Sequence, residues 1–276
     1  MRVLILKKMT IIKCAVCLLL IIIGVVAAKL MFDDTEEVFG PAQQNEMVTG
    51  VNTETKVVAL TFDTTFGNDR TEQILEILDA ADVKCTFAVM GAWANENPET
   101  VQAIVDDGHE LISHSMSHGR YNDMSDEEML EDAKAARAML AGEYGANTSY
   151  IRPPYGALSS EKAAVLWENG FIPVKWSIDA MDWQGDGSDA VTERVLSAVQ
   201  PGSIIVMQNN SEDAVGALLN LVKQLEKQGY QMVTLSELMA MDDSAGASVP
   251  RTSRQPAITA MPTGTAAAVE PSKQAS

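Results

Sequence analysis

The chain has 276 residues, a formal net charge of −18 and a hydrophobic content of 46%. This length accommodates one α/β domain of barrel size, and the composition is that of a folded globular protein. The strong negative charge argues against nucleic acid or an anionic lipid surface as a partner, because both would repel it.

The N-terminus has the composition of an export segment. Four basic residues within the first 13 positions precede residues 14–28, a run of uncharged and almost wholly apolar side chains. Such a pattern is typical of a secretory signal or an N-terminal anchor, with a buried core helix as the alternative. Residues 9–28 are about long enough to cross a bilayer, while Val26 and Ala28 would suit a cleavage site. We therefore expect residues 1–28 to be a signal or transmembrane anchor in a bacterial membrane, with the rest of the chain outside the cytoplasm.

Composition divides the rest of the chain into three parts. Residues 29–54 are polar and rich in turn-forming residues, which indicates a stalk-like linker. Residues 241–276 are rich in Ala, Ser, Thr and Pro without a hydrophobic period, which predicts a disordered tail. Residues 55–240 form one predicted domain, whose single cysteine, Cys85, leaves no partner for an internal disulfide. We expect this domain to be monomeric.

Within this domain, short β-rich runs alternate with helical patterns. Helices are expected at 71–81 and 125–145, and the second opens with a capping box of Ser125 and Glu128 and ends at Gly145. Strands are expected at 56–62, 85–90, 110–113, 150–152, 171–177, 203–207 and 230–235. The alternation predicts an α/β fold with a parallel sheet, and about seven such units favour a distorted (β/α) barrel.

Polar side chains follow most of the expected strands. In a (β/α) barrel the carboxyl ends of the strands meet at one mouth, where the active site lies. We therefore expect one site from residues scattered over about 150 positions of sequence. The candidates are Asp63, His114, His118, Arg152, Tyr155, Asp179, Asp182, Trp183 and Gln208.

Two of the three histidines stand four residues apart, directly after the third expected strand. On a helical turn, positions 114 and 118 would share a face at the separation needed to hold one metal ion. Neutral imidazoles suit Zn²⁺, Co²⁺, Ni²⁺ or Fe²⁺, and Asp63 could add a carboxylate. The alternative is a surface helix with two solvated histidines. His109 precedes the same strand, at the other end of the barrel, and is predicted to be structural.

Five short motifs resemble those of the NodB-type polysaccharide deacetylases, carbohydrate esterase family 4. They are TFDTTFG (61–67), HSMSH (114–118), RPPYG (152–156), DAMDW (179–183) and IIVMQ (204–208), in the family's order and spacing. The resemblance covers roughly residues 57–238. The first motif is most similar to the sporulation and cell-envelope branch.

The resemblance implies metal-assisted removal of acetyl groups from N-acetylglucosamine units in peptidoglycan or chitin-like polymers. Asp63 matches the general base that activates water at the metal, and His114 and His118 match the metal ligands, with zinc the expected ion. Arg152 matches the arginine that holds the base, and the backbone N–H of Tyr155 matches an oxyanion-hole donor. A substrate groove wall is implied at the remaining positions, Asp179, Asp182 and Trp183, with a place in the core as the alternative for Trp183.

Two positions depart from the family pattern. Thr64 stands where the resemblance implies a second aspartate as third metal ligand, and a neutral hydroxyl is a poor substitute. Gln208 stands where it implies a histidine acting as general acid, and an amide cannot donate a proton to a leaving amine. Glu212 or Asp213 would have to take that role if any nearby side chain does. Loss of the general acid typically lowers the rate by about 10²–10⁴-fold, so we expect weak activity or none.

Three functions therefore remain open from the sequence. The first is a membrane-tethered, metal-dependent N-deacetylase of cell-envelope glycan. The second is a non-catalytic envelope protein that binds glycan on a deacetylase scaffold. The third is a hydrolase of another amide or ester, since the same metal site would polarise any carbonyl.

Overall fold

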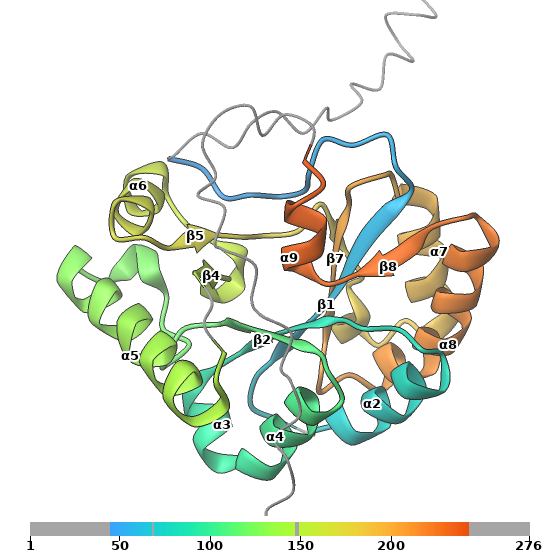
Figure 1. Cartoon of the computed structure of the whole chain (residues 1–276), viewed down its shortest axis with the longest axis horizontal. Coiled ribbons are helices and arrows are strands. Elements are labelled where there is room, and N and C mark those ends of the chain that lie inside the picture. Colours follow the sequence, from blue (N-terminus) through green and yellow to red (C-terminus); the bar gives the residue numbers. More distant parts are fainter. Residues whose placement is uncertain (1–44, 68, 147–148, 243–276) are drawn as a thin grey trace, which may run out of the picture.

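The computed structural model describes residues 45–67, 69–146 and 149–242, and shows one curled sheet surrounded by helices (Figure 1). All strand pairs are parallel, in the order β5-β4-β3-β2-β1-β7-β6, with β8 also paired to β1. The strands are β1 (Val57–Thr64), β2 (Thr86–Val89), β3 (Glu110–Ser113), β4 (Tyr150–Ile151), β5 (Ile172–Pro173), β6 (Ile178–Asp179), β7 (Ile204–Gln208) and β8 (Gln231–Val233). Every residue of β1 is buried, as expected for a central strand covered on both faces.

The predicted distorted (β/α) barrel is confirmed, with one refinement in the number of strands. The sheet contains eight strands, because the expected strand at 171–177 is interrupted and its continuation forms β6. The predicted distortion has a physical cause: the terminal strands of the sheet, β5 and β6, do not pair with each other.

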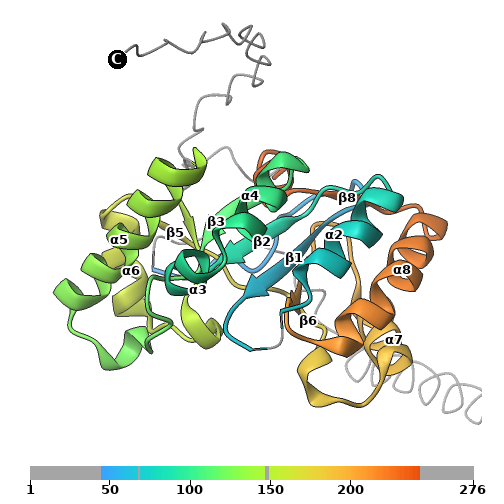
Figure 2. The same ribbon diagram turned by 90° about the horizontal axis from the view of Figure 1, so that it is seen from below.

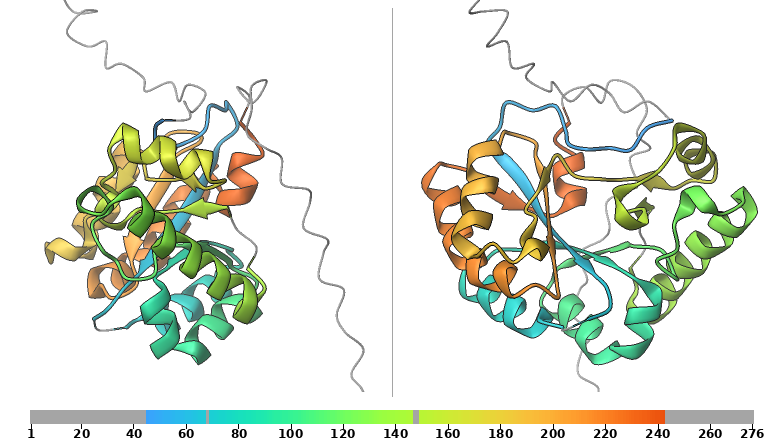
Figure 3. Two further views of the ribbon diagram at one scale, coloured as in Figure 1. Left: turned by 90° about the vertical axis from the view of Figure 1, so that its left-hand side faces the viewer. Right: turned by 180° about the vertical axis from the view of Figure 1, so that it is seen from behind.

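Helices cover the outside of this sheet. Figure 2 shows the strands between α5 and α6 on one side and α7 and α8 on the other, and the view from behind in Figure 3 shows the same ring. The helices are α2 (Thr71–Ala80), α3 (Gly91–Glu96), α4 (Pro98–Asp106), α5 (Asp126–Tyr144), α6 (Ser160–Glu168), α7 (Ser188–Ala198), α8 (Glu212–Lys227) and α9 (Leu235–Met239). Short 3₁₀ turns are η1 (Tyr121–Asp123), η2 (Pro154–Gly156) and η3 (Asp182–Gln184).

The predicted caps of α5 are confirmed. The Ser125 hydroxyl accepts a hydrogen bond from the Glu128 N–H, while the Glu128 carboxylate accepts one from the Ser125 N–H. The helix ends at Gly145, whose φ of 68° lies in the left-handed region that favours glycine. These caps set the two ends of α5.

The predicted linker boundary at residue 54 is wrong. Val48 and Val51 are 4% and 1% exposed and belong to the core at the amino end of the strands. Val48 donates its N–H to Pro173 O, and Val51 donates its N–H to Gly202 O. This segment, blue in Figure 1, therefore spans from β5 to the start of β7 where those strands do not pair. Two isolated valines among polar residues carry too little periodic signal to reveal this.

The amino end of the barrel is closed by α9. The Thr86 hydroxyl accepts a hydrogen bond from Leu235 N–H and donates one to the Glu110 carboxylate, which also accepts from Ser236. Nearby, the buried His109 accepts the Cys85 N–H at Nδ1, which fits the structural role predicted for it. The open end of the barrel is therefore the carboxyl end of the strands.

No helix within the described ranges is long and apolar enough to cross a membrane. The predicted export segment at 1–28 lies outside the described residues, as does the predicted tail from residue 243 onward.

Candidate active site

The predicted convergence at the carboxyl edge of the sheet is present in the structure. Asp63 is the penultimate residue of β1 and stands in register with Gln208, the last residue of β7. His114 and Arg152 directly follow β3 and β4. Asp63, His114 and Arg152 are 4%, 1% and 0% exposed, so three ionisable side chains meet in an almost fully buried position.

Asp63 and Arg152 form the electrostatic centre of this site. Arg152 Nη1 donates to Asp63 Oδ1 at 2.6 Å, and Nη2 donates a longer bond of 3.4 Å to the carbonyl of Lys175. The backbone N–H of Arg152 also bonds to Ser113 O at 2.8 Å, which fixes the chain at the end of β4. A buried carboxylate is costly unless it is paired, and Arg152 supplies that pairing while leaving Asp63 Oδ2 free.

His114 is oriented by the backbone. Its Nδ1 lies 2.8 Å from Arg152 O, and because a carbonyl only accepts, Nδ1 carries the proton. Its unprotonated Nε2 lies 3.7 Å from Asp63 Oδ2 and 3.2 Å from His118 Nε2. Burial lowers the pKa of both histidines, and that of His118 falls to about 4. Both rings are therefore neutral at pH 7, the form in which imidazole binds metals.

The predicted helical turn at the histidine pair is wrong, although the two rings do meet. Residues 114–118 form a tight loop in which Ser115 and His118 have left-handed φ angles of 67° and 59°. The Ser115 hydroxyl accepts the His118 N–H at 2.8 Å, and the two rings stand edge to face at 4.9 Å. Serine side chains that bond to nearby backbone compete with helix formation, which explains the difference.

Asp132 on α5 holds this loop, and sequence reasoning missed it. Its Oδ1 accepts from Met116 N–H at 2.9 Å and from the Tyr121 hydroxyl at 2.8 Å. Its Oδ2 accepts from the N–H and the hydroxyl of Ser117 at 2.9 Å and 2.6 Å. One carboxylate thus fixes the loop between the two histidines. Asp132 lies in an acidic helix, where nothing in the sequence distinguishes it from its neighbours.

We expect Asp132→Asn to lower the affinity for zinc or cobalt by about 10–100-fold, the usual effect of losing a residue that orients metal ligands. The amide presents an NH₂ group where Asp132 now accepts from Ser117, so the loop loses its anchor. Calorimetric titration of the metal into the purified protein measures this. Glu131→Gln removes the neighbouring exposed charge and should leave the affinity unchanged. Equal affinities for the two variants would contradict this role of Asp132.

The donor set fits a divalent metal ion in part. Two nitrogen ligands about 2.0–2.1 Å from one tetrahedral ion lie roughly 3.3 Å apart, close to the 3.2 Å between the two Nε2 atoms. The described residues contain no group of three or more His, Cys, Asp or Glu side chains arranged to hold a metal. Thr64 contributes nothing to the pair, because its buried hydroxyl donates to Ala88 O at 3.1 Å. The histidines therefore supply two strong donors, with Asp63 beside them.

Tyr155 lies at the mouth of the site. Its φ of 63° turns the backbone sharply after the two prolines, and its side chain is 51% exposed. The ring contacts that of His118 edge to face at 4.8 Å, and the guanidinium of Arg120 lies 4.1 Å above it. Within the described part of the chain, no hydrogen bond uses the Tyr155 backbone N–H. That N–H has the freedom that an oxyanion-hole donor requires.

The predicted groove wall divides into different roles. Trp183 is 64% exposed, as a sugar-stacking side chain would be, and Asp179 shapes the turn by accepting the Met181 N–H at 2.8 Å. Asp182 is only 2% exposed, so its place in a groove wall is wrong. Its Oδ2 accepts the Gln208 N–H at 3.0 Å, whereas Oδ1 is buried and has no hydrogen-bond partner among the described residues. Burial raises the pKa of Asp182 to about 6. Asp182 thus holds the backbone at the end of β7.

The two acids considered as substitutes for a general acid are engaged elsewhere. Glu212 forms an exposed ion pair with Arg70 at 3.5 Å, and Asp213 accepts the Gly187 N–H at 3.0 Å. The fully buried Asn209, which sequence reasoning also missed, holds the loop after β1. Its Oδ1 accepts the Thr65 N–H and its Nδ2 donates to Asp69.

Comparison with known proteins identifies the family of this chain. The family model described as polysaccharide deacetylase matches residues 50–174. The chain is 31% identical over 183 residues to peptidoglycan-N-acetylglucosamine deacetylase PgdA of Listeria monocytogenes, which covers 66% of this chain but 39% of PgdA. This chain therefore spans about two fifths of the length of that relative. It is 32% identical over 199 residues to the chitooligosaccharide deacetylase of Sinorhizobium fredii, covering 65% of this chain and 90% of the relative.

Solved structures give the same result. BA3943 of Bacillus anthracis, a CE4 family pseudoenzyme, is similar with a TM-score of 0.68 and 27% identity, over 71% of this chain and 70% of that one. A BA3943 mutant with restored enzymatic activity matches with the same TM-score, at 28% identity over 71% of this chain and 72% of that one. Since the fold is shared and the Sinorhizobium relative is matched over 90% of its length, this chain belongs to the polysaccharide deacetylase family.

Proposed function

We propose that this protein is a weak, metal-dependent N-deacetylase of cell-envelope glycan, tethered outside the bacterial cytoplasm by residues 1–28. The observation that carries the proposal is the group formed by the buried Asp63, Arg152 and His114 with the half-buried His118 at the open end of the barrel. A base, its counter-ion and two neutral imidazoles are the parts that amide hydrolysis at a metal requires. The membrane tether rests on the sequence pattern alone.

Each side chain has a step that its geometry suits. Because Arg152 occupies Oδ1 of Asp63, the free Oδ2 is the atom that would take a proton from the attacking water. The Tyr155 N–H would stabilise the negative charge that forms on the acetyl oxygen. Breaking the C–N bond then requires a proton on the leaving amine. Acetate and a free amino sugar are the products.

His114 and His118 would hold the divalent ion, zinc being the best match to two neutral imidazoles. Such an ion supplies a Lewis acid for the acetyl carbonyl and lowers the pKa of water. The carbonyl of Arg152 would keep His114 in the tautomer whose Nε2 faces the ion.

The described part of the site lacks an evident general acid to protonate the leaving amine. Gln208 stands in register with Asp63 but carries an amide, which has no proton to give at neutral pH. Asp63 would therefore have to return to the amine the proton that it took from water. One carboxylate serving both steps explains why we propose slow turnover.

The full-length protein should release acetate from N-acetylglucosamine oligomers when zinc or cobalt is added. Asp63→Asn should abolish this release, because the amide cannot take the proton, whereas Asp79→Asn, at an exposed position of α2, should retain it as the control. Acetate is quantified by an enzyme-coupled assay over several hours, so that slow turnover is also detected. Absence of release at every metal concentration, from folded protein, would rule out the catalytic proposal.

A second candidate is a glycan-binding protein without activity, favoured by Thr64 and Gln208 at two catalytic positions and by the likeness to the BA3943 pseudoenzyme. Here His114→Ala would leave glycan affinity unchanged. Binding that requires both the metal and His114 would exclude this candidate.

A further inference from the structure

Arg120 occupies a distinctive place at the mouth of the site. It follows His118 by two residues, and its side chain is exposed. The centre of its guanidinium lies 4.1 Å above the ring of Tyr155, which in turn contacts His118 at 4.8 Å. One tyrosine ring thus separates this cation from the histidine pair.

Among the residues that the structure describes, none provides a counter-ion for Arg120. Of the five arginines in the described part of the chain, Arg70, Arg152 and Arg194 form ion pairs, and Arg137 lies over the ring of Phe171. No described carboxylate lies within ion-pair distance of Arg120, although the chain carries 38 acidic and 20 basic residues. An unpaired cation in so acidic a protein marks a position where a negative group would be favoured.

The guanidinium is also held in place. A cation over an aromatic face gains about 0.5–1 kcal/mol at an exposed site, and the stacked plane loses less freedom when it forms further hydrogen bonds. The ring beneath it is itself fixed by the η2 backbone and by its contact with His118. A fork of N–H donors beside the open end of the barrel matches the two oxygens of a carboxylate.

We propose that Arg120 is a specificity-determining residue that binds a carboxylate of the substrate, so that this site prefers an acidic glycan to a neutral one. The inference rests on the proposed function, because it takes the histidine pair as the point where the acetylated sugar is bound. Peptidoglycan carries such carboxylates on its lactyl groups or its stem peptides, whereas chitin oligomers carry none. The guanidinium recognises the carboxylate in either position.

The test measures equilibrium binding of the full-length protein to four probes by calorimetry. They are N-acetylglucosamine oligomers, peptide-free strands alternating N-acetylglucosamine and N-acetylmuramic acid, the same strands with methyl-esterified lactyl groups, and strands bearing stem peptides. We expect Arg120→Gln to weaken binding of the acidic strands about tenfold and of the neutral oligomers less than about twofold. The acidic probe whose affinity falls more in Arg120→Gln identifies whether the carboxylate belongs to the lactyl group or to the stem peptide. Arg120→Lys, which keeps the charge but not the fork, should lie between.

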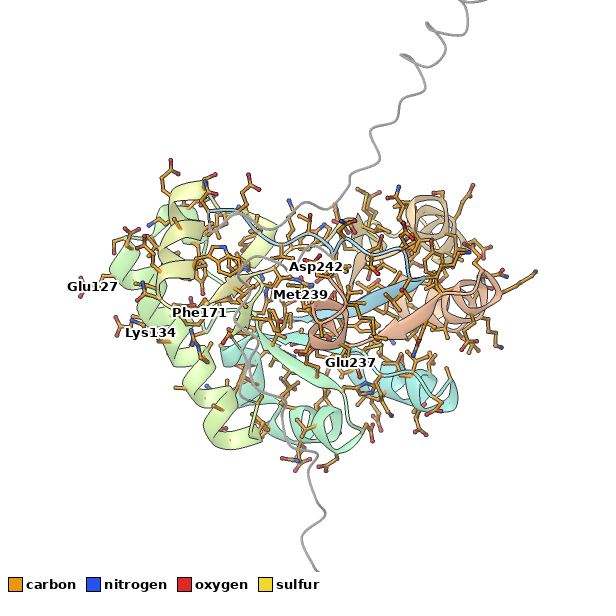
Figure 4. All side chains as sticks on the ribbon, turned by 45° about the horizontal axis from the view of Figure 1, so that its top comes forward. Glu127, Lys134, Phe171, Glu237, Met239 and Asp242 are labelled. Atoms are coloured by element: carbon orange, nitrogen blue, oxygen red, sulfur yellow. The ribbon has the colours of Figure 1, made fainter. Side chains whose placement is uncertain are left out.

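The control is Lys134→Gln, which removes a charge from the outer face of α5, away from the sheet (Figure 4). Its affinities should equal those of the unmodified protein. Unchanged binding of acidic strands by Arg120→Gln, or an equal loss for acidic and neutral ligands, would overturn the role of Arg120 and leave the proposed function standing. Failure of the unmodified protein to bind any of the four glycans would overturn both.

Discussion

Replacing Thr64 by Asp and Gln208 by His in one chain is expected to raise the rate of acetate release by about 10²–10⁴-fold, the usual contribution of a general acid. The aspartate should also tighten metal binding by adding a third ligand. The two positions lie at the ends of adjacent central strands. The site would then hold separate groups for the two proton transfers that the proposed mechanism assigns to Asp63 alone.

The strand register supports both substitutions. Thr64 pairs with Val89, which pairs with Ser113, the residue before His114, so position 64 stands at the same level of the sheet as the histidine loop. The cost of Thr64→Asp is the hydrogen bond from its hydroxyl to Ala88 O, and it leaves a carboxylate buried unless a metal is bound. We therefore expect the thermal midpoint of this single variant to depend more strongly on zinc than that of the unmodified protein.

The surroundings of position 208 suit a histidine acting as general acid. Gln208 pairs with Asp63 across neighbouring parallel strands, so the two side chains point to the same face of the sheet. Behind it, Asp182 accepts the backbone N–H of residue 208 through Oδ2 and retains a buried Oδ1 that has no partner in the described part of the chain. An imidazole N–H within hydrogen-bond distance of that oxygen would give it a partner.

The experiment compares acetate release and zinc affinity of the two single variants and the double variant. Asn210→His places a histidine two residues further along and serves as the control for the general effect of an added imidazole. If the double variant binds zinc tightly and still releases no acetate, the barrel is a binding scaffold and the deacetylase proposal fails. The restored activity of a BA3943 mutant shows that a related pseudoenzyme can recover catalysis.

The site could be located from sequence because its main residues lie at the ends of parallel strands. Once the alternation of strands and helices is recognised, residues far apart in sequence must meet at one edge, as Asp63, His114 and Arg152 do. The caps of α5 were equally predictable, because Ser125 and Glu128 act within its first turn and Gly145 acts at its last turn. Interactions between residues close in sequence, or between residues placed by the alternation of strands and helices, can therefore be predicted from the sequence.

What escaped prediction depends on long-range contacts of ordinary residues. Asp132 and Asn209 are unremarkable in sequence, and only the folded chain shows which backbone groups they bind. The burial of Asp182 follows from the packing of η3 against β7 and α8 and not from the DAMDW motif itself. The helical turn expected at the histidines failed because local serine bonds outweighed a spacing argument.

Replacing Arg152 by Met is expected to lower the free energy of unfolding by about 3–5 kcal/mol, the cost of leaving a buried charge without its partner. Arg152 is fully buried, and its bond of 2.6 Å is the only salt bridge to an Arg or Lys that Asp63 makes among the described residues. The side chain is also large, so that methionine would fill only part of its volume. Urea unfolding at pH 7 with a chelator present measures the loss without compensation by a metal.

The size of this loss in stability depends on Asp63 remaining buried without a partner. A second substitution can test this. In the double variant Arg152→Met with Asp63→Asn, no charge remains to be buried, so most of the lost stability should return despite the removal of two polar partners. Arg70→Met is the matched control, because its ion pair with Glu212 is exposed and should contribute less than about 1 kcal/mol. If the single variant Arg152→Met lost no more than this control, Asp63 would have to be solvated in its absence. In that case the rest of the site would not by itself keep the Asp63 carboxylate buried. The buried electrostatic centre on which the proposed chemistry depends would then exist only while the arginine is present.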